Sequence, residues 1–249
     1  MADLYIGCSG FNYPHWRGRF YPGELPERAW FGHYCGCFRS VELNVTFYRL
    51  VKPETFSRWQ RETPAGFSFS LKGSRFITHV KRLADPEEPL ERFFAGASHL
   101  GEKLRTVLWQ LPPAFGCNTA RLARFLALLG RYPVRHALEL RNATWDTAEV
   151  ADLCREHRVA LCLADWPEFT DRLPLTADFV YLRRHGRQGD YATCYSQEQL
   201  RGDADRIARY LGQGLSVQVY FNNDADAHAP TNALELARLL EGPARPAGK

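Results

Sequence analysis

Eight short, apolar, strand-like segments recur along the chain, and most of them end in a charged or amide side chain. Helix-length amphipathic segments separate most of the eight, and strands that alternate with helices predict parallel pairing in an α/β fold. Eight such units in 249 residues match the size of a (β/α)8 barrel of the TIM type. The predicted strands are Leu4–Cys8, Ser40–Asn44, Phe67–Lys72, Thr106–Gln110, Ala137–Arg141, Leu161–Asp165, Phe179–His185 and Val217–Asn222.

The segments between the strands carry helix-start signals. Asn118 and Ser196 are suited to be N-caps of helices. The link after the sixth strand, Trp166–Ala177, holds two prolines and little helical period, so we expect a short helix or none there. We expect one barrel domain over residues 1–242 and a disordered tail over residues 243–249, although length alone also fits two smaller domains. The predicted helices are Glu27–Cys35, Pro53–Glu62, Pro89–Lys103, Thr119–Gly130, Thr147–His157, Gln197–Leu211 and Thr231–Leu240.

Composition limits the class of protein. With 45% hydrophobic and 24% charged residues, the chain has the make-up of an ordinary soluble globular protein. Its net charge is only +4, and its 32 basic residues are interspersed with 28 acidic ones, which argues against a nucleic-acid binder. The seven cysteines form no C-x-x-C pair and predict reduced thiols. The chain enters its first strand at once and has no apolar run near the roughly 20 residues that span a bilayer. We therefore expect a cytoplasmic protein without a signal peptide or a membrane partner.

The alternation of side chains along each strand predicts which of them face the barrel interior. In the third strand, for example, Phe69 and Leu71 oppose Ser70 and Lys72. Because the apolar face must pack on the helices, the polar face should point inward. Active sites of such barrels lie at the C-terminal ends of the strands. The inward polar residues expected at that end are Glu42, Asn44, Lys72, Gln110, Glu139, Arg141, Asp165, Arg183, His185 and Asn222.

The charges in this set nearly cancel, and that balance favours acid–base chemistry over a metal cage. Three cations close to the carboxylates would raise the cost of binding a divalent metal, so we expect neither a metal nor another cofactor. Neighbouring charges can instead move carboxylate and lysine pKa values toward the working pH. Arg141 and Arg183 could hold an anionic substrate group bidentately. A structural ion-pair network is the alternative reading of each residue. The predicted catalytic residues are Glu42, Lys72, Glu139, Asp165 and His185.

The loops that follow the strands add substrate-binding candidates. The first loop, residues 9–22, packs five aromatic residues among Gly and Pro, and forms either a rigid plug or a substrate cover. Tyr13 and Trp16 would contact substrate in the second case. The Gly-rich, basic segment 185–191 lies where TIM barrels often bind phosphate. The predicted substrate-binding residues are Tyr13, Trp16, Asn44, Tyr48, His79, Gln110, Arg141, Arg183, Asn222 and Asn223.

Several motifs together resemble those of the YecE-like family, known as domain of unknown function 72. They include Val41-Glu-Leu-Asn-Val-Thr-Phe-Tyr48, Phe69-Ser-Leu-Lys72, Glu139-Leu-Arg141, Arg183-Arg-His-Gly186 and Tyr220-Phe-Asn-Asn-Asp224. The resemblance runs from about residue 4 to about residue 240. It implies a TIM-type barrel and no established reaction. Family motif residues found here are Glu42, Asn44, Lys72, His79, Gln110, Glu139, Arg141, Arg183, His185, Asn222 and Asn223.

These observations leave three functional hypotheses. The leading one is a metal-independent hydrolase, lyase or isomerase that acts on a small sugar-like or phosphorylated compound. In it, Glu42 and Glu139 are general acid and base, and Lys72 tunes them or acts as a base or Schiff-base amine. The second is a metal-dependent barrel, either endonuclease-like or sugar-isomerase-like. The third is a non-catalytic ligand-binding module that uses the aromatic mouth.

Overall fold

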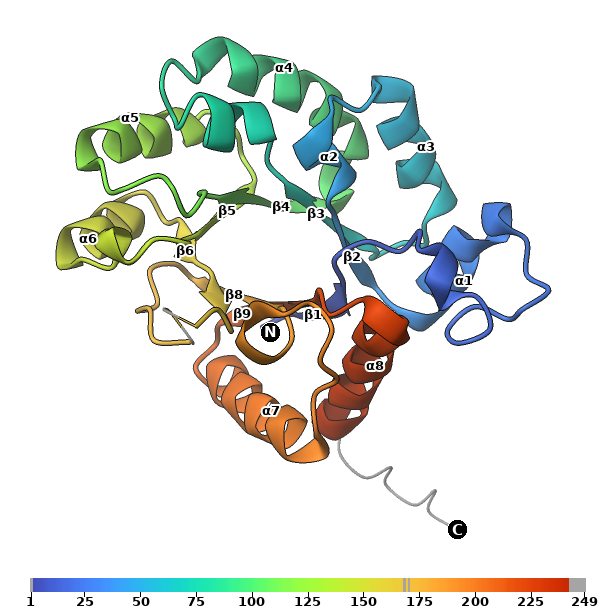
Figure 1. Cartoon of the computed structure of the whole chain (residues 1–249). Coiled ribbons are helices and arrows are strands. Elements are labelled where there is room, and N and C mark those ends of the chain that lie inside the picture. The colour runs from blue at the N-terminus through green and yellow to red at the C-terminus, as the bar shows by residue number, and fades with distance from the viewer. Residues whose placement is uncertain (1, 168, 170, 242–249) are drawn as a thin grey trace.

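The computed structural model describes residues 2–167, 169 and 171–241, and its strands form a ring enclosed by helices (Figure 1). All the strand pairs are parallel. One sheet has the order β1-β9-β8-β7 and the other the order β2-β3-β4-β5-β6. The strands are β1 (Leu4–Cys8), β2 (Ser40–Leu43), β3 (Ser68–Lys72), β4 (Leu104–Gln110), β5 (Arg135–Glu139), β6 (Ala160–Leu161), β7 (Leu163–Ala164), β8 (Phe179–Arg184) and β9 (Ser216–Phe221).

Two seams join the sheets into the circular order of a TIM-type barrel. At the first seam, only Cys162 separates β6 from β7, and its backbone N–H donates to the Leu138 carbonyl at 2.9 Å. At the second seam, Ser9 and Glu42 form a parallel bridge just beyond β1 and β2. The strand predicted over 161–165 is therefore two short pieces, one in each sheet. The α/β fold with parallel strands that the sequence predicts is confirmed.

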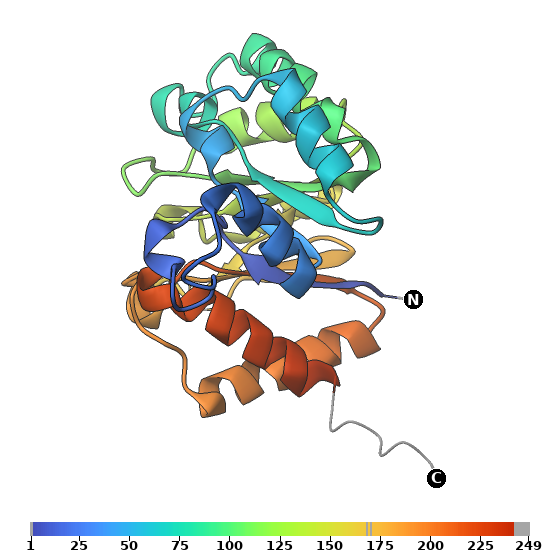
Figure 2. The ribbon, with the colours of Figure 1, turned by 90° about the vertical axis from the view of Figure 1, so that its right-hand side faces the viewer.

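Helices cover the outside of the ring, and the N-terminus lies at the end of the ring where the strands begin (Figure 2). The link after the sixth strand contains no helix among its described residues, as expected. Asn118 and Ser196 cap their helices as predicted, and Ser196 forms a capping box with Gln199. The α-helices are α1 (Trp30–Cys37), α2 (Val45–Tyr48), α3 (Pro53–Glu62), α4 (Glu87–Ala97), α5 (Thr119–Leu129), α6 (Ala148–Glu156), α7 (Gln197–Gly212) and α8 (His228–Glu241).

Several boundaries differ from the prediction for local physical reasons. The helix predicted over Pro89–Lys103 starts two residues earlier and breaks into α4 and the 3-10 segment η4 (Ser98–Lys103), where Gly101 has a φ of 57°. The helix predicted from Glu27 begins with the 3-10 turn η2 (Glu27–Ala29) before α1. The one-turn helix α2 was not predicted, because its β-branched and aromatic residues favour a strand. The predicted tail over 243–249 lies outside the described residues.

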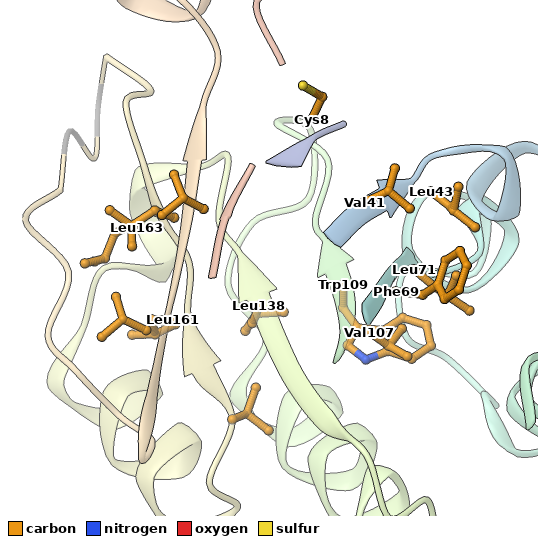
Figure 3. Close-up of a cluster of buried hydrophobic side chains, with 14 of the residues drawn as sticks. Cys8, Val41, Leu43, Phe69, Leu71, Val107, Trp109, Leu138, Leu161 and Leu163 are labelled. Atoms are coloured by element: carbon orange, nitrogen blue, oxygen red, sulfur yellow. The ribbon is translucent and has the colours of Figure 1, made fainter. Parts of the chain in front are cut away.

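The inside and outside of the ring follow the predicted alternation. Apolar side chains of successive strands point to the helix layer and form the larger core, as Figure 3 shows for Val41, Leu71 and Trp109. The inner face carries a smaller cluster that includes Leu108, Tyr181 and Tyr220. Polar inner residues complete it: Ser70 donates to Gln218 and to Tyr220, and Gln218 donates to Thr106. Hydrogen bonding offsets the cost of placing these polar groups inside the ring.

Two further expectations concern cysteines and membranes. All seven cysteines are unpaired, and Cys8, Cys154 and Cys162 are buried, in agreement with the prediction of structural thiols. Burial raises the pKa of each of these three thiols, so each stays protonated at neutral pH. Within the described part of the chain, no helix has the length and apolar character needed to cross a membrane.

Candidate functional site

A buried arginine, Arg183 of β8, links two carboxylates at the C-terminal end of the ring, which we call the mouth. Its Nε and Nη2 donate to Glu42 Oε1 at 3.1 and 2.7 Å, and its Nη1 donates to Glu139 Oε2 at 2.7 Å. Ser9 Oγ donates to Glu42 Oε1 at 2.6 Å, and Tyr181 OH donates to Oε2 at 2.7 Å. The side chains of Glu42, Glu139 and Arg183 are at most 1% exposed. Charged groups this deeply buried are tolerated only because their hydrogen bonds to one another replace the hydrogen bonds that they would form with water.

Most of the other polar side chains at the mouth contact the second carboxylate, Glu139, or one another. Gln110 Nε2 donates to Glu139 Oε2 at 2.9 Å, and Arg141 Nε donates to Oε1 at 2.7 Å. His185 Nε2 lies 3.2 Å from the same Oε1 and 2.9 Å from Arg141 Nη2. Asn222 Nδ2 lies 3.0 Å from His185 Nδ1. The structure therefore brings together the predicted residues of five strand ends in one network, which we call the ion ring: Glu42, Gln110, Glu139, Arg141, Arg183, His185 and Asn222.

Titration of the ion ring is fixed by these contacts. Although burial opposes its charge, Arg141 and Arg183 hold the pKa of the Glu139 carboxyl well below its usual value. Burial and the nearby Arg183 lower the pKa of His185 to about 4, so the imidazole of His185 is neutral at pH 7. Each oxygen of Glu139 already accepts at least two hydrogen bonds. The ion ring thus carries charges that neutralise one another and leaves little capacity for proton transfer.

Lys72, at the end of β3, is a predicted catalytic residue that lies outside the ion ring. Its Nζ lies 4.3 Å above the Phe47 ring and forms no hydrogen bond or ion pair with a described residue. The side chain as a whole is half-buried. Burial and the nearby Arg183 lower the pKa of Lys72 to about 8, while Glu139 and Glu42 oppose that change. A substantial fraction of this amine is therefore neutral near physiological pH.

Three local features hold Lys72 in place. Gly73 follows it, and a Cβ there would lie 2.2 Å from the Trp109 ring, so only glycine fits this close approach. The Thr46 hydroxyl of α2 donates to the Lys72 carbonyl oxygen at 2.7 Å. The same one-turn helix supplies Phe47, whose ring attracts the ammonium form. The short helix after β2 is therefore the support for the end of β3.

His79, in the single π-helical turn η3 (Phe76–Val80), also packs on Phe47. The rings of His79 and Phe47 are 4.9 Å apart and nearly perpendicular. Burial and the nearby Lys72 lower the pKa of His79 to about 4. The Thr78 hydroxyl lies 3.2 Å from the Ser74 carbonyl oxygen and 2.9 Å from His79 Nδ1. In the tautomer in which Thr78 donates to Ser74 and accepts from Nδ1–H, Nε2 is unprotonated. This neutral imidazole can accept a proton beside the lysine. A π-helical turn is a frequent feature of functional sites.

Asp165 occupies a different position from the other predicted catalytic residues. Its Oδ1 accepts a hydrogen bond from the His185 backbone N–H at 2.7 Å, and its Oδ2 accepts from Tyr195 OH. Tyr195 OH in turn accepts from the Gly186 N–H at 2.8 Å. Burial raises the pKa of Asp165 above its usual value. Asp165 therefore fixes the end of β8 and the orientation of His185, instead of joining the ion ring.

Some predicted substrate-binding residues are used by the fold. Arg183, a predicted substrate-binding residue, is fully buried, and each of its three side-chain nitrogens already donates to a protein oxygen. Trp16 is fully buried and donates to the Asp224 carbonyl at 3.1 Å, so it belongs to a plug. Tyr13 packs on Trp16 and donates to the Ser9 carbonyl at 2.6 Å. Asn223 is buried and donates to Thr193 and Asn232, which ties loops together.

Two other candidates remain at the mouth, and two contributing residues were not predicted. Tyr48 is 75% exposed beside Phe47. Asn44 Nδ2 donates to the Ser9 carbonyl at 3.3 Å, while its buried Oδ1 has no hydrogen-bond partner among the described residues. The alternation along the strand places Tyr181 inside the ring of strands, but it does not predict the hydrogen bond from Tyr181 to Glu42 on another strand. Trp166 stacks on Arg141, with the guanidinium carbon 3.7 Å from the ring centroid. Its position directly after a strand end was the available signal.

The ion ring also bears on metal binding. Among the described residues, no group of three His, Cys, Asp or Glu side chains is arranged to hold a metal ion. The carboxylates that the sequence brings to the mouth are bonded to arginines, which compete with any cation for the same oxygens.

Comparisons with known proteins show what this chain is similar to. A family model described as "Protein of unknown function DUF72" matches residues 5–248. The chain is 25% identical to the UPF0759 protein YunF of Bacillus subtilis, with 96% of this chain and 95% of YunF covered. A DUF72 family protein from Thermotoga maritima superimposes with a TM-score of 0.84 at 31% identity, with 96% of this chain and 99% of that one covered. A D-psicose 3-epimerase from Clostridium cellulolyticum superimposes with a TM-score of 0.54 at 12% identity over 97% and 93% of the chains, which shows a shared fold.

Proposed function

The chain belongs to the DUF72 family, and we propose that it is an acid–base enzyme that acts, without a metal, on a small sugar-like compound. The observation that carries the proposal is a half-buried lysine whose amine has no carboxylate partner among the described residues, beside a ring of acids and bases that satisfy one another. A binding module has no need of a partly neutral lysine at the point where the strand ends meet. Lys72 and His79 are the two groups with proton-transfer capacity, and the ion ring is their electrostatic frame.

The contacts of Glu42 and Glu139 argue against the roles of general acid and base that the sequence suggested for them. Glu42 and Glu139 accept hydrogen bonds on both oxygens, so in this proposal they hold Arg183 and Arg141 and do not act as acid and base. Their negative charge stabilises positive charge that forms at Lys72, because both raise the pKa of that amine. Fixed charges of this kind cost no reorganisation when the reaction occurs.

The polar groups of the mouth support an uncharged, hydroxylated substrate. The two arginines are neutralised by carboxylates, so a phosphate would have to displace Glu139 or Glu42 from them. Arg141 Nη1, which forms no hydrogen bond with a described residue, can still donate to a hydroxyl or carbonyl oxygen. The exposed ring of Tyr48, beside Phe47, offers an apolar face. This combination of one apolar wall and a few polar groups is typical of small-molecule sites.

The proposal is tested by following the hydrogens of candidate substrates. Aldoses, ketoses and their phosphates are incubated in D2O with EDTA, and proton NMR records exchange of carbon-bound hydrogen or a new product. We expect turnover with the wild type that falls at least 100-fold in Lys72→Met. Lys52→Met, which removes an exposed lysine at the start of α3, should retain it. Turnover that requires an added divalent metal, or binding of a compound that Lys72→Met leaves unchanged, would contradict the proposal.

A further inference from the structure

Lys72 differs from the other described buried lysine in having an amine that the fold does not use. Lys103 Nζ donates to the Gln60 carbonyl, the Thr63 carbonyl and Thr63 Oγ1 at 2.7, 2.7 and 2.9 Å. The amine of Lys72 lies over the face of Phe47, in the field of the ion ring, and forms no hydrogen bond with any residue that the structure describes. A half-buried amine held by backbone contacts but not by its own nitrogen is placed to form a bond with a ligand.

Two features of the surroundings offset part of the cost of a cation at this nitrogen, which burial and Arg183 otherwise disfavour. The Phe47 ring lies 4.3 Å from Nζ and attracts positive charge on its face. Glu42 and Glu139 both act on Lys72 as negative charges, although hydrogen bonds hold them on Arg183. His79, neutral and close to Lys72, supplies Nε2 for proton transfer in the tautomer that leaves this nitrogen unprotonated. A nucleophilic amine, a proton acceptor and fixed stabilisation for a cation therefore meet at one strand end.

We propose that Lys72 forms a covalent imine with a carbonyl substrate, such as an aldose or ketose in its open-chain form. This inference rests on the proposed function and names the substrate class of the same site. Imine formation gives the site an electron sink, because a protonated imine accepts the electron pair released when an adjacent C–H or C–C bond breaks. Lys72 is then a catalytic residue, whereas Glu42 and Glu139 are positioning residues.

The step balances without any additional reactant. The Nζ lone pair of neutral Lys72 attacks the carbonyl carbon, and the C=O π electrons move to oxygen to give a carbinolamine. A proton passes from nitrogen to this oxygen, with His79 Nε2 as carrier. A second proton, from the solvent or a protonated neighbour, then lets the hydroxyl leave as water while the nitrogen lone pair completes the C=N bond. Overall, a carbonyl compound and the lysine ammonium give a protonated imine and one water molecule.

The lysine's titration sets the expected selectivity. With a pKa of about 8 against about 10.5 for an ordinary lysine, Lys72 carries about 200-fold more neutral amine at pH 7.5. Partial burial reduces its access to reagents, so we expect a smaller advantage of at least tenfold in imine formation over exposed lysines. The chain contains only five lysines, which makes the modified position easy to assign.

The experiment is reductive trapping on the full chain at pH 7.5. The protein is incubated with dihydroxyacetone or glyceraldehyde and sodium borohydride, and peptide mass spectrometry measures the secondary amine at each lysine. We expect Lys72 to be modified at least tenfold more than the exposed Lys52 and Lys81. In Lys72→Arg, which keeps the charge but cannot form an imine, the extra modification should vanish, with a cooperative unfolding transition showing that the variant folds.

The outcomes separate the imine from the enzyme proposal. Modification of Lys72 no greater than that of Lys52 and Lys81 overturns the imine. If turnover of a sugar is nevertheless lost in Lys72→Met, the acid–base proposal stands and Lys72 acts as a base. Selective trapping at Lys72 without turnover of any compound in the panel supports the imine and counts against the proposed enzymatic function.

Discussion

Replacing Lys72 by methionine should make the protein more stable at neutral pH, although Lys72 is a predicted catalytic residue. Methionine keeps the length of the side chain and its contact with Phe47, and it removes a charge that the site disfavours. The pKa of Lys72 falls from 10.5 to about 8 in the folded chain. At 1.36 kcal/mol per pKa unit, this corresponds to about 3 kcal/mol of lost stability when the amine is charged in both states. Because the side chain is only half-buried, screening by water reduces the expected gain to between about 1 and 3 kcal/mol.

The sign and the pH window of this effect are fixed by linkage. A lysine whose folded pKa is lowered favours the folded state fully only above the unfolded pKa, and that contribution is lost as pH falls through the folded value. The wild type should therefore gain stability as pH rises from about 8 to 10.5, and Lys72→Met should show a smaller rise. Urea unfolding of both proteins at pH 7, 8, 9 and 10, followed by circular dichroism, measures the difference.

The matched control is Lys103→Met, at the other described buried lysine. Its amine donates three hydrogen bonds to Gln60 and Thr63, so methionine leaves buried carbonyl oxygens unsatisfied. We expect this variant to lose about 2 to 4 kcal/mol. If Lys72→Met instead destabilises the protein at pH 7 as Lys103→Met does, then Lys72 is held by the carboxylates as an ordinary ion pair. That result would contradict our inference that the Lys72 amine forms no ion pair with Glu42 or Glu139.

Three further predictions concern Glu139, His136 and Lys72. Glu139→Gln should lower stability by about 3 to 5 kcal/mol in urea unfolding, because it leaves Arg141 and Arg183 buried with a missing partner; a loss below about 1 kcal/mol would show that water replaces the carboxylate. Burial lowers the pKa of His136 to about 4, so stability present above pH 6.5 should be lost as pH falls, and His136→Phe should remove roughly 2 kcal/mol of that loss between pH 6.5 and 4.5; an unchanged slope would contradict it. For any substrate found, kcat/KM should rise with pH through an apparent pKa of about 8, and a profile flat from pH 6 to 9 would remove Lys72 from the reaction.

The fold was largely predictable because strand phase is a local property that the whole ring repeats. Alternation in β3 and β8 placed Phe69 and Val180 outside and Ser70 and Tyr181 inside, as the core clusters confirm. The break between β6 and β7 could not be predicted. Strand pieces of two residues in different sheets are defined by the neighbours with which they pair, and their sequence alone reads as one strand.

The sequence predicts which residues gather at the site, but it does not predict which of them pair with one another. Strand ends identified the acids and bases, yet the pairing of Arg183 with Glu42 and Glu139 depends on distances across the ring that no local pattern contains. The same holds for Lys72, whose lack of a partner follows from arginines on other strands taking the carboxylates. The support from Phe47 was missed because a one-turn helix after β2 has residues that favour a strand.

The most direct test of the account is a titration of the lysine side chains by NMR. With lysine labelled by 13C at the ε carbon, five resonances report the protonation of five amines as pH rises from 6 to 11. We predict that one resonance titrates near pH 8 and disappears in Lys72→Met, while the other four keep their positions. If the resonance lost in Lys72→Met titrates at or above about pH 10, Lys72 is an ordinary cation and the central claim is wrong.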